Sequence, residues 1–215
     1  MSLIEEAKNA VMTYNNKAAA EVANKAIAEN ADIVELIQNG FTKGMTEVGA
    51  LFEAKKLYLP HVMAAAAAMN AAMDILSPAL EKSGGKVKSE LGTVVICTIE
   101  GDIHSIGKDI VAIMLKVSGF DVQNIGRDIP IDQIVEACKK FEPVAVGTSA
   151  LMTSTMTGQK TFEERLKKAG IRDKLLTNVG GAPVTQQWAD EIGADLYTEN
   201  ASDAAAKFTA AFEKK

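Results

Sequence analysis

The chain has 215 residues, of which 47% are hydrophobic and only 5% aromatic, and its formal net charge at pH 7 is −5. This length allows one large domain or two small ones, each with a hydrophobic core. The acidic balance argues against binding to nucleic acid, which requires dense patches of Lys and Arg.

The amino-terminal part of the chain is predicted to be helical. It lacks the basic and then apolar pattern of a signal peptide, and we find no apolar run of the roughly 20 residues that span a membrane, so we expect a cytoplasmic protein. Residues 3–81 have Ala-rich runs with apolar residues three and four apart. Asn, Gly and Pro mark helix ends near residues 14–16, 30–32, 39–40 and 58–60. We therefore predict a helical bundle, a cap domain of about four or five helices, over residues 1–82.

A different pattern follows a short polar stretch, residues 83–91, which we predict to be a linker. Beyond it, runs of β-branched residues alternate with helical stretches. The predicted strands are residues 93–96, 121–125, 144–146, 175–179 and 195–198. The predicted helices are residues 106–118, 131–140, 155–169, 186–192 and 204–213. This alternation predicts an α/β domain over residues 92–215 with a flavodoxin-like (Rossmann-type) five-stranded parallel sheet.

The loop after the first predicted strand contains Asp102, His104 and Gly107. Sheets of this type bind ligands beyond the carboxyl ends of their strands. A loop histidine can direct one ring nitrogen outward while a carboxylate two residues earlier accepts the other ring N–H. Gly107 would let a bulky ligand approach the backbone. On these residues alone, a polar loop with a helix-capping residue remains an alternative.

Two further strand-end loops are rich in hydroxyl groups and glycine. Their residues of interest are Ser149, Thr153, Thr155, Gly180 and Gly181. Helix capping and ordinary turns account for part of this pattern. Because the carboxyl ends of parallel strands meet at one edge of a sheet, these loops could also line a deep, partly polar slot there.

The histidines and cysteines restrict the choice of metal site. The chain has only two histidines, His61 and His104, and neither lies among plausible zinc ligands. If His104 binds a metal, the other ligands should therefore come from a macrocycle. His61 is interpreted as a surface residue at the start of a helix. Cys97 and Cys138 lie far apart, in strand-like and helix-like segments, and are predicted to be buried, inert thiols.

Three spaced motifs resemble those of the base-off/His-on cobalamin-binding proteins. They are Asp102-Ile103-His104-Ser105-Ile106-Gly107, Ser149-Ala150-Leu151 and Gly180-Gly181-Ala182. In the helical part, residues 44–53 and 58–63 resemble the cap of the methyl-transferring branch of that family. The resemblance covers nearly the whole chain. It is nearest to the small corrinoid proteins of methylamine metabolism in methanogens, and among them to the monomethylamine branch.

This resemblance implies a role for each matching residue. His104 would be the lower ligand of the cobalt in a cobalamin-type corrinoid (a methylcobamide), in place of the cofactor's own base. Asp102 would bond the other ring nitrogen, and Thr155 would extend this relay where the related methionine synthase carries Ser.

The remaining candidate residues would contact the rest of the cofactor. Gly107, Gly180 and Gly181 would leave room for the displaced nucleotide tail, and Ser149, Leu151 and Thr153 complete the cofactor-binding set on this side. From the cap, Phe52, Leu59 and Val62 would shield the methyl group on the upper face.

The function implied is that of a corrinoid methyl carrier. It would accept a methyl group from a methylamine, expected to be monomethylamine, through a substrate-specific methyltransferase. A methylcobamide:coenzyme M methyltransferase would then take the methyl group in methanogenesis, and a reductive activation protein is the third expected partner. Since no substrate-activating site is visible, we expect a carrier subunit rather than a stand-alone enzyme.

Three other interpretations stay open at this point. One is the small subunit of an adenosylcobalamin mutase, although the cap residues Phe52 and Leu59 suit a methyl group better than an adenosyl group. Another is a cobalamin sensor without catalysis, which would usually carry a basic DNA-binding domain. The last is a flavodoxin-like or receiver-type domain without corrinoid, which would leave the Ser149 and Gly180–Gly181 motifs unexplained.

Overall fold

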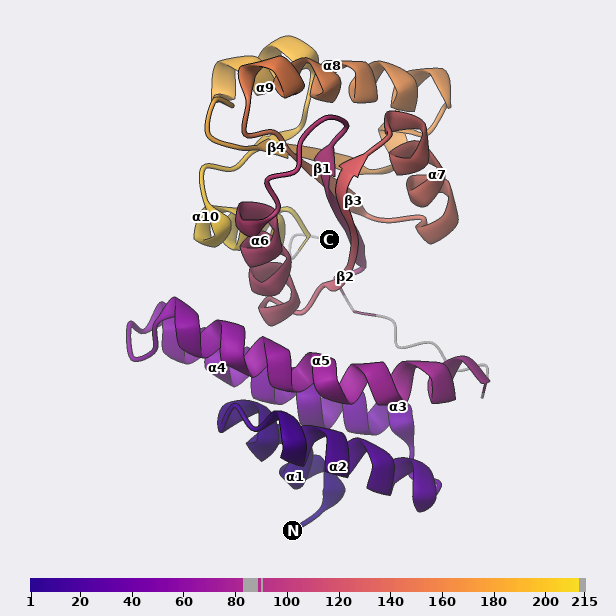
Figure 1. The fold of residues 1–215 in the computed structure, drawn as a ribbon, viewed down its shortest axis with the longest axis vertical. Coiled ribbons are helices and arrows are strands. Elements are labelled where there is room, and N and C mark those ends of the chain that lie inside the picture. The colour runs from indigo at the N-terminus through magenta and orange to yellow at the C-terminus, as the bar shows by residue number, and fades with distance from the viewer. Residues whose placement is uncertain (83–88, 90, 213–215) are drawn as a thin grey trace. The chain divides into compact units, whose positions relative to one another are not determined.

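The computed structural model describes residues 1–82, 89 and 91–212 (Figure 1). Most of the predicted linker, residues 83–88 and 90, lies outside this described part. The chain divides into two compact units. One is built from residues 1–88 with residues 117–119, and the other from the rest of the chain.

The first unit consists of helices. They are α1 (Leu3–Met12), α2 (Asn16–Ala28), α3 (Ile33–Leu36), the π-helix η1 (Ile37–Thr42), α4 (Lys43–Glu53) and α5 (Leu59–Lys82). The first three begin at polar side chains that accept a main-chain N–H of the first turn, as N-caps do; these are Ser2, Asn15 and Asp32. Much of the buried core is alanine, so these helices approach one another closely.

The predicted helix end at Asn39–Gly40 is wrong, because the chain continues through η1 into α4 without a break. Gly40 serves a different purpose. A Cβ atom there would lie 2.8 Å from the Cβ of Ala7 and 3.2 Å from the carbonyl oxygen of Ile4. This glycine therefore allows α1 to pack directly against η1, and a close contact of this kind cannot be distinguished from a helix end by composition.

Helix α5 contains a stretch, Leu59–Leu80, that is long and apolar enough by composition to cross a membrane, with a mean hydropathy of 1.3. The expectation that no such run exists is wrong by this criterion, since the alanines at residues 64–68 raise the mean. The core helix of a soluble protein passes the same test. Here α5 packs against α2, and Ala65, Ala68 and Leu76 are fully buried.

The second unit is an α/β domain. Its strands are β1 (Thr93–Ile99), β2 (Asp121–Ile129), β3 (Ala145–Ser149), β4 (Leu176–Gly180) and β5 (Leu196–Tyr197). Its helices are α6 (Ile106–Val117), α7 (Ile131–Phe141), α8 (Thr153–Lys168), the short 3-10 helix η2 (Arg172–Lys174), α9 (Gln186–Ile192) and α10 (Ala201–Phe212). The predicted fold class is confirmed. The main difference is β2, which continues four residues past its predicted end at Ile125 to Ile129.

All strand pairs are parallel, in the order β2-β1-β3-β4-β5. Alternate residues of β1 face opposite layers. Cys97 and Ile99 pack with α7 and α8, whereas Val94 and Ile96 pack with α6 and α10. From β1 the chain first goes to β2 on one side, and it then crosses over to β3 on the other side of β1. The carboxyl ends of β1 and β3 therefore form the switch point at which such sheets bind ligands.

The two thiols are expected to be unreactive in the folded protein. Cys97 and Cys138 are free and buried, as predicted, and burial raises the pKa of both, that of Cys138 to about 12. Because the thiolate is the reactive form, a thiol reagent at neutral pH should modify neither residue in the native state and both in concentrated guanidinium chloride. Rapid modification of the native protein, followed by mass spectrometry, would contradict this burial.

Candidate functional site

The loop between β1 and α6 brings Asp102 and His104 into direct contact. The Nδ1 atom of His104 lies 2.9 Å from Oδ1 of Asp102, and the main-chain N–H of His104 donates to the same oxygen at 2.9 Å. Asp102 is fully buried, whereas the His104 side chain is 44% exposed. The histidine is therefore fixed on its protein side and open on the other.

Asp102 is also held by the loop between β3 and α8. Its Oδ2 atom accepts the main-chain N–H of Leu151 at 2.6 Å and the hydroxyl of Thr155 at 2.8 Å. Burial raises the pKa of this carboxyl, but the hydrogen bonds from His104, Leu151 and Thr155 outweigh it and lower the pKa to about 2. The carboxylate can then only accept, so in the neutral imidazole the proton belongs on Nδ1, and Nε2 is the nitrogen with the lone pair.

The two loops that hold Asp102 and His104 also present apolar side chains. Four large hydrophobic side chains in these loops and at the start of α6 are exposed: Ile103, Ile106, Leu151 and Met152. A Cβ atom at Gly107 would meet no atom within 4 Å. Exposed apolar side chains in the same loops as a partly exposed histidine, with open space at Gly107, fit a flat macrocycle that carries a metal.

No group of three or more His, Cys, Asp or Glu side chains able to hold a metal ion occurs among the described residues. That a macrocycle would supply the other ligands of a metal at His104 stays a prediction.

The glycines after β4 are required by the protein itself. Gly181 has a φ of +123°, and a Cβ atom there would lie 1.8 Å from the carbonyl oxygen of Ala150. At Gly180 it would lie 3.2 Å from the carbonyl oxygen of Thr198. Backbone atoms thus fill the space next to both residues, and the main-chain N–H of Ala150 donates to the Gly180 oxygen at 3.0 Å. Room for a nucleotide tail is not needed to explain these two glycines.

The other predicted residues of this unit lie at the same edge of the sheet. Ser149 is the last residue of β3 and pairs with Thr98 and Gly180 of the neighbouring strands. Thr153 is exposed at the first position of α8.

The cap residues belong to the helical unit. Phe52 lies near the end of α4 and Leu59 begins α5, both half-buried, while Val62 is fully buried. His61 accepts the main-chain N–H of Tyr58 on Nδ1 at 3.2 Å. It therefore stabilises the start of α5, as a residue at a helix start does.

Several residues that support the site carried no recognisable sequence signal. Gln159, fully buried in α8, donates to the carbonyl oxygens of Thr148 at 3.0 Å and Gly180 at 3.3 Å. Lys108, also buried, donates to Asp109 at 2.6 Å and to Asn124 at 2.7 Å. Gln159 thus anchors the ends of β3 and β4, and Lys108 joins α6 to β2, through polar side chains that a sequence would place in solvent.

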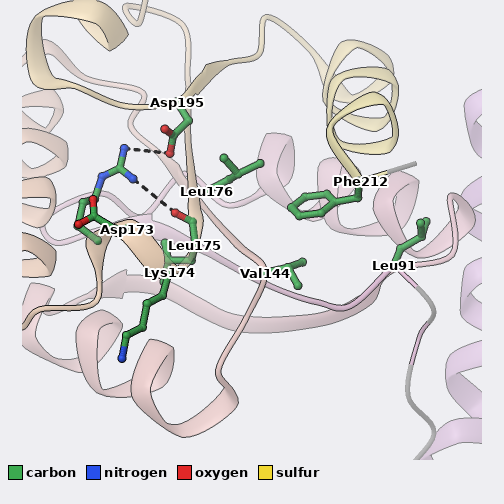
Figure 2. A pocket seen from close by; sticks show the side chains of 9 residues that line it. Leu91, Val144, Asp173, Lys174, Leu175, Leu176, Asp195 and Phe212 are labelled. Carbon is green, nitrogen blue, oxygen red and sulfur yellow. Dashed lines mark hydrogen bonds and ion pairs between the residues drawn. The ribbon is translucent and has the colours of Figure 1, made fainter. Parts of the chain in front are cut away.

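A cavity of about 520 Å³ lies at the opposite edge of the sheet (Figure 2). Val144, Leu175 and Leu176, at the amino ends of β3 and β4, contribute to its lining. Arg172, which lines the cavity together with Lys174, donates to Glu163 at 2.5 Å and to Asp195 at 2.9 Å. The cavity lies at the amino ends of these strands, whereas His104 follows the carboxyl end of β1, so the cavity is not part of the candidate site.

Comparison with known proteins gives matches over both units. A B12 binding domain model matches residues 92–206, and a second B12 binding domain model matches residues 3–77. The chain is 57% identical over 208 residues to trimethylamine corrinoid protein 1 of Methanosarcina acetivorans, covering 97% of this chain and 96% of that protein. It is 47% identical to dimethylamine corrinoid protein 1 of the same organism, covering 95% of each.

Two solved structures cover 99% of this chain. The methanol:cobalamin methyltransferase complex MtaBC from Methanosarcina barkeri gives a TM-score of 0.84 at 32% identity, over 80% of the matched chain. The monomethylamine corrinoid protein from Methanosarcina barkeri gives a TM-score of 0.54 at 35% identity, over 98% of its chain.

Proposed function

This chain belongs to the family of corrinoid proteins that includes the trimethylamine and dimethylamine corrinoid proteins of Methanosarcina, and on that premise we propose that it is a corrinoid methyl carrier. The single observation that carries this proposal is the partly exposed His104 side chain, whose Nδ1 lies against a buried, charged Asp102. The relatives match over nearly the whole chain, which favours this function over a mutase subunit, a sensor or a domain without corrinoid.

The residues of the β1–α6 loop would hold the cobalt of a cobalamin-type corrinoid from below, in the base-off/His-on state. When bound, the corrinoid supplies the chemistry by which a methyl group is accepted and released. His104 would offer Nε2 as one removable ligand. Asp102 would keep the imidazole in a single tautomer and orientation, as carboxylates do for metal-bound histidines, and Thr155 and the Leu151 N–H would hold Asp102 in turn.

The other side chains of the site would enclose the cofactor. Ile103, Ile106, Leu151 and Met152 would cover the lower face and exclude water from His104. Ser149 and Thr153 would contact the nucleotide tail, and the open space at Gly107 would admit it. Phe52 and Leu59, which keep exposed surface, would shield the upper face, with the buried Val62 supporting them.

The substrate of the system is proposed to be a methylamine, with trimethylamine first. The identity to trimethylamine corrinoid proteins, 53% to 57%, exceeds the 35% to the monomethylamine protein that the sequence motifs suggested. The proposed partners are a methylamine methyltransferase, a methylcobamide:coenzyme M methyltransferase and a reductive activation protein, all in the cytoplasm.

The test is a methyl-transfer assay with separate methyltransferases. The apoprotein is reconstituted with hydroxocobalamin, reduced and mixed in turn with trimethylamine, dimethylamine and monomethylamine methyltransferases and their substrates. We expect the absorption change of corrinoid methylation to be fastest with the trimethylamine enzyme. Failure to bind cobalamin would rule out the carrier function, and binding without methylation by any of the three would rule out a methylamine as the substrate. Faster methylation with monomethylamine would change the substrate only.

A further inference from the structure

The loop that carries Asp102 and His104 is tied to the end of β2 by Asp128. The Oδ1 atom of Asp128 accepts the main-chain N–H of Gly101 at 2.7 Å. Its own main-chain N–H donates to Oγ1 of Thr98 at 2.7 Å and to the carbonyl oxygen of Asp102 at 3.0 Å. The buried Thr98 hydroxyl donates in turn to that same Asp102 carbonyl. Asp128 and Thr98 together therefore make three hydrogen bonds to the loop, one with the Gly101 N–H and two with the Asp102 carbonyl oxygen.

The backbone at this point is bent in an uncommon way. Asp128 has a φ of +52°, in the left-handed region that few residues other than Gly, Asn and Asp adopt readily. The β1–β2 pairing also shifts register between Ile96 and Cys97 and again between Cys97 and Ile99. Irregularities of this kind redirect side chains at strand ends. Here the bend turns both the carboxylate and the N–H of Asp128 toward the neighbouring loop.

The geometry points to Asp128 as a positioning residue for His104, acting through the backbone of Gly101 and Asp102. These contacts fix the main chain of Asp102 from one side, and the Asp102 carboxylate then fixes the imidazole from the other. This inference rests on the proposed function, because it assigns Asp128 to the setting of the lower ligand. Asp128 is itself exposed, so it contributes through these hydrogen bonds to the loop and not through burial of its side chain.

Ligation by His104 would then depend on Asp128, a residue outside the cofactor-binding motifs. A carboxylate that accepts a backbone N–H makes a charge-assisted hydrogen bond, stronger than a neutral one. Without this hydrogen bond, the Gly101 N–H turns to solvent. The loop then samples more conformations, because glycine, here with a φ of +84°, places few steric restrictions on the backbone. His104 would then spend more time away from the orientation that ligation requires.

The test compares D128G with D128N. Glycine keeps the left-handed backbone and removes the acceptor, whereas asparagine keeps both the backbone preference and an acceptor oxygen. E142G is the matched control, since Glu142 is another exposed acidic residue with a positive φ, of +44°, at the end of α7. T98V removes the other contact to the Asp102 carbonyl and gives an independent second variant, should D128G fail to fold.

Two readouts are needed. In the apoprotein, hydrogen exchange at the Gly101 amide measures how often its hydrogen bond to Asp128 opens, without any cofactor. In protein labelled with ¹⁵N-histidine, reconstituted with cobalamin and reduced to Co(II), the ¹⁵N splitting in the electron paramagnetic resonance (EPR) spectrum reports the ratio of His-on to His-off forms, because the cofactor's own base gives ¹⁴N splitting instead. We expect D128G to speed exchange at Gly101 and to lower this ratio about tenfold, as loss of one charge-assisted hydrogen bond does. T98V should shift both readouts the same way, and D128N and E142G should resemble the parent.

Two results would overturn the inference. One is a D128G or T98V protein with the parent's exchange rate and ligation ratio, and the other is an E142G protein that changes as much as D128G. Failure of the proposed function would look different, because the parent protein itself would then show no ¹⁵N splitting from a histidine.

Discussion

Replacing His104 with glycine is expected to abolish the nitrogen splitting from the lower ligand while leaving the fold intact. His104 contributes an exposed side chain, and three of the four hydrogen bonds to the Asp102 carboxylate come from other groups that glycine leaves in place. They are the main-chain N–H of residue 104, the N–H of Leu151 and the hydroxyl of Thr155. The buried carboxylate therefore stays satisfied, and the free energy of unfolding should fall by only about 1 kcal/mol.

The measurement is an EPR spectrum of the Co(II) form of the reconstituted protein labelled with ¹⁵N-histidine, in which ¹⁵N splitting identifies a protein ligand and ¹⁴N splitting the cofactor's own base. Part of the cobalamin should remain bound through contacts elsewhere on the cofactor, but without a protein nitrogen on cobalt. Added ¹⁵N-imidazole should occupy the space left by the side chain and restore the ¹⁵N splitting. The control is H61A, because His61 is the other histidine in the chain. A retained ¹⁵N signal in H104G, or its loss in H61A alone, would show that His104 is not the ligand.

The sequence predicted the sheet and the edge at which the candidate site lies, because these depend on local patterns. Strand–helix alternation places Asp102, Ser149 and Gly180 at the carboxyl ends of β1, β3 and β4, where the structure has them. The contact between Asp102 and His104 was also predictable, since two residues apart in one loop leave few arrangements.

The contacts that support the site were not predictable in this way. Asp128 lies four residues after Asn124, in a stretch that reads as a turn, and its bond to Gly101 joins residues 27 positions apart. Gln159 has the sequence context of an exposed helix position, yet the ends of β3 and β4 enclose it. Long-range hydrogen bonds of this kind depend on tertiary packing, which leaves no periodic pattern in the chain.

Glycine residues show most clearly what the sequence does not predict, because a glycine in the sequence does not reveal which structural contact requires it. Gly40 allows two helices to touch, Gly107 opens onto free space, and Gly181 is forced by a neighbouring carbonyl. The sequence assigned Gly107 and Gly181 the same role beside the cofactor. Their surroundings differ, so alanine at Gly181 should lower the stability of the apoprotein, whereas alanine at Gly107 should lower the affinity for the cofactor.

Alanine at Gly181 is expected to destabilise the apoprotein strongly. Its φ of +123° disfavours any side chain, and its Cβ would lie 1.8 Å from the Ala150 oxygen. Ala150 cannot easily yield, because its N–H is bonded to Gly180 and the next residue, Leu151, donates to Asp102. Strain and overpacking together should lower the free energy of unfolding by about 3 kcal/mol, measured by urea denaturation. The shift at Leu151 should also reduce the His-on fraction of whatever protein folds.

Alanine at Gly107 is the matched comparison, because it adds the same methyl group at the same edge of the sheet. No protein atom lies within 4 Å of the new Cβ, and α6 gains a better helix former, so apoprotein stability should stay equal or rise by about 0.5 kcal/mol. Affinity for hydroxocobalamin should fall instead, since the methyl group enters the space assigned to the cofactor. If G107A binds cobalamin as well as the parent, the corrinoid does not lie against this helix start. If G181A is as stable as the parent, the contact with Ala150 does not constrain the loop that holds Asp102.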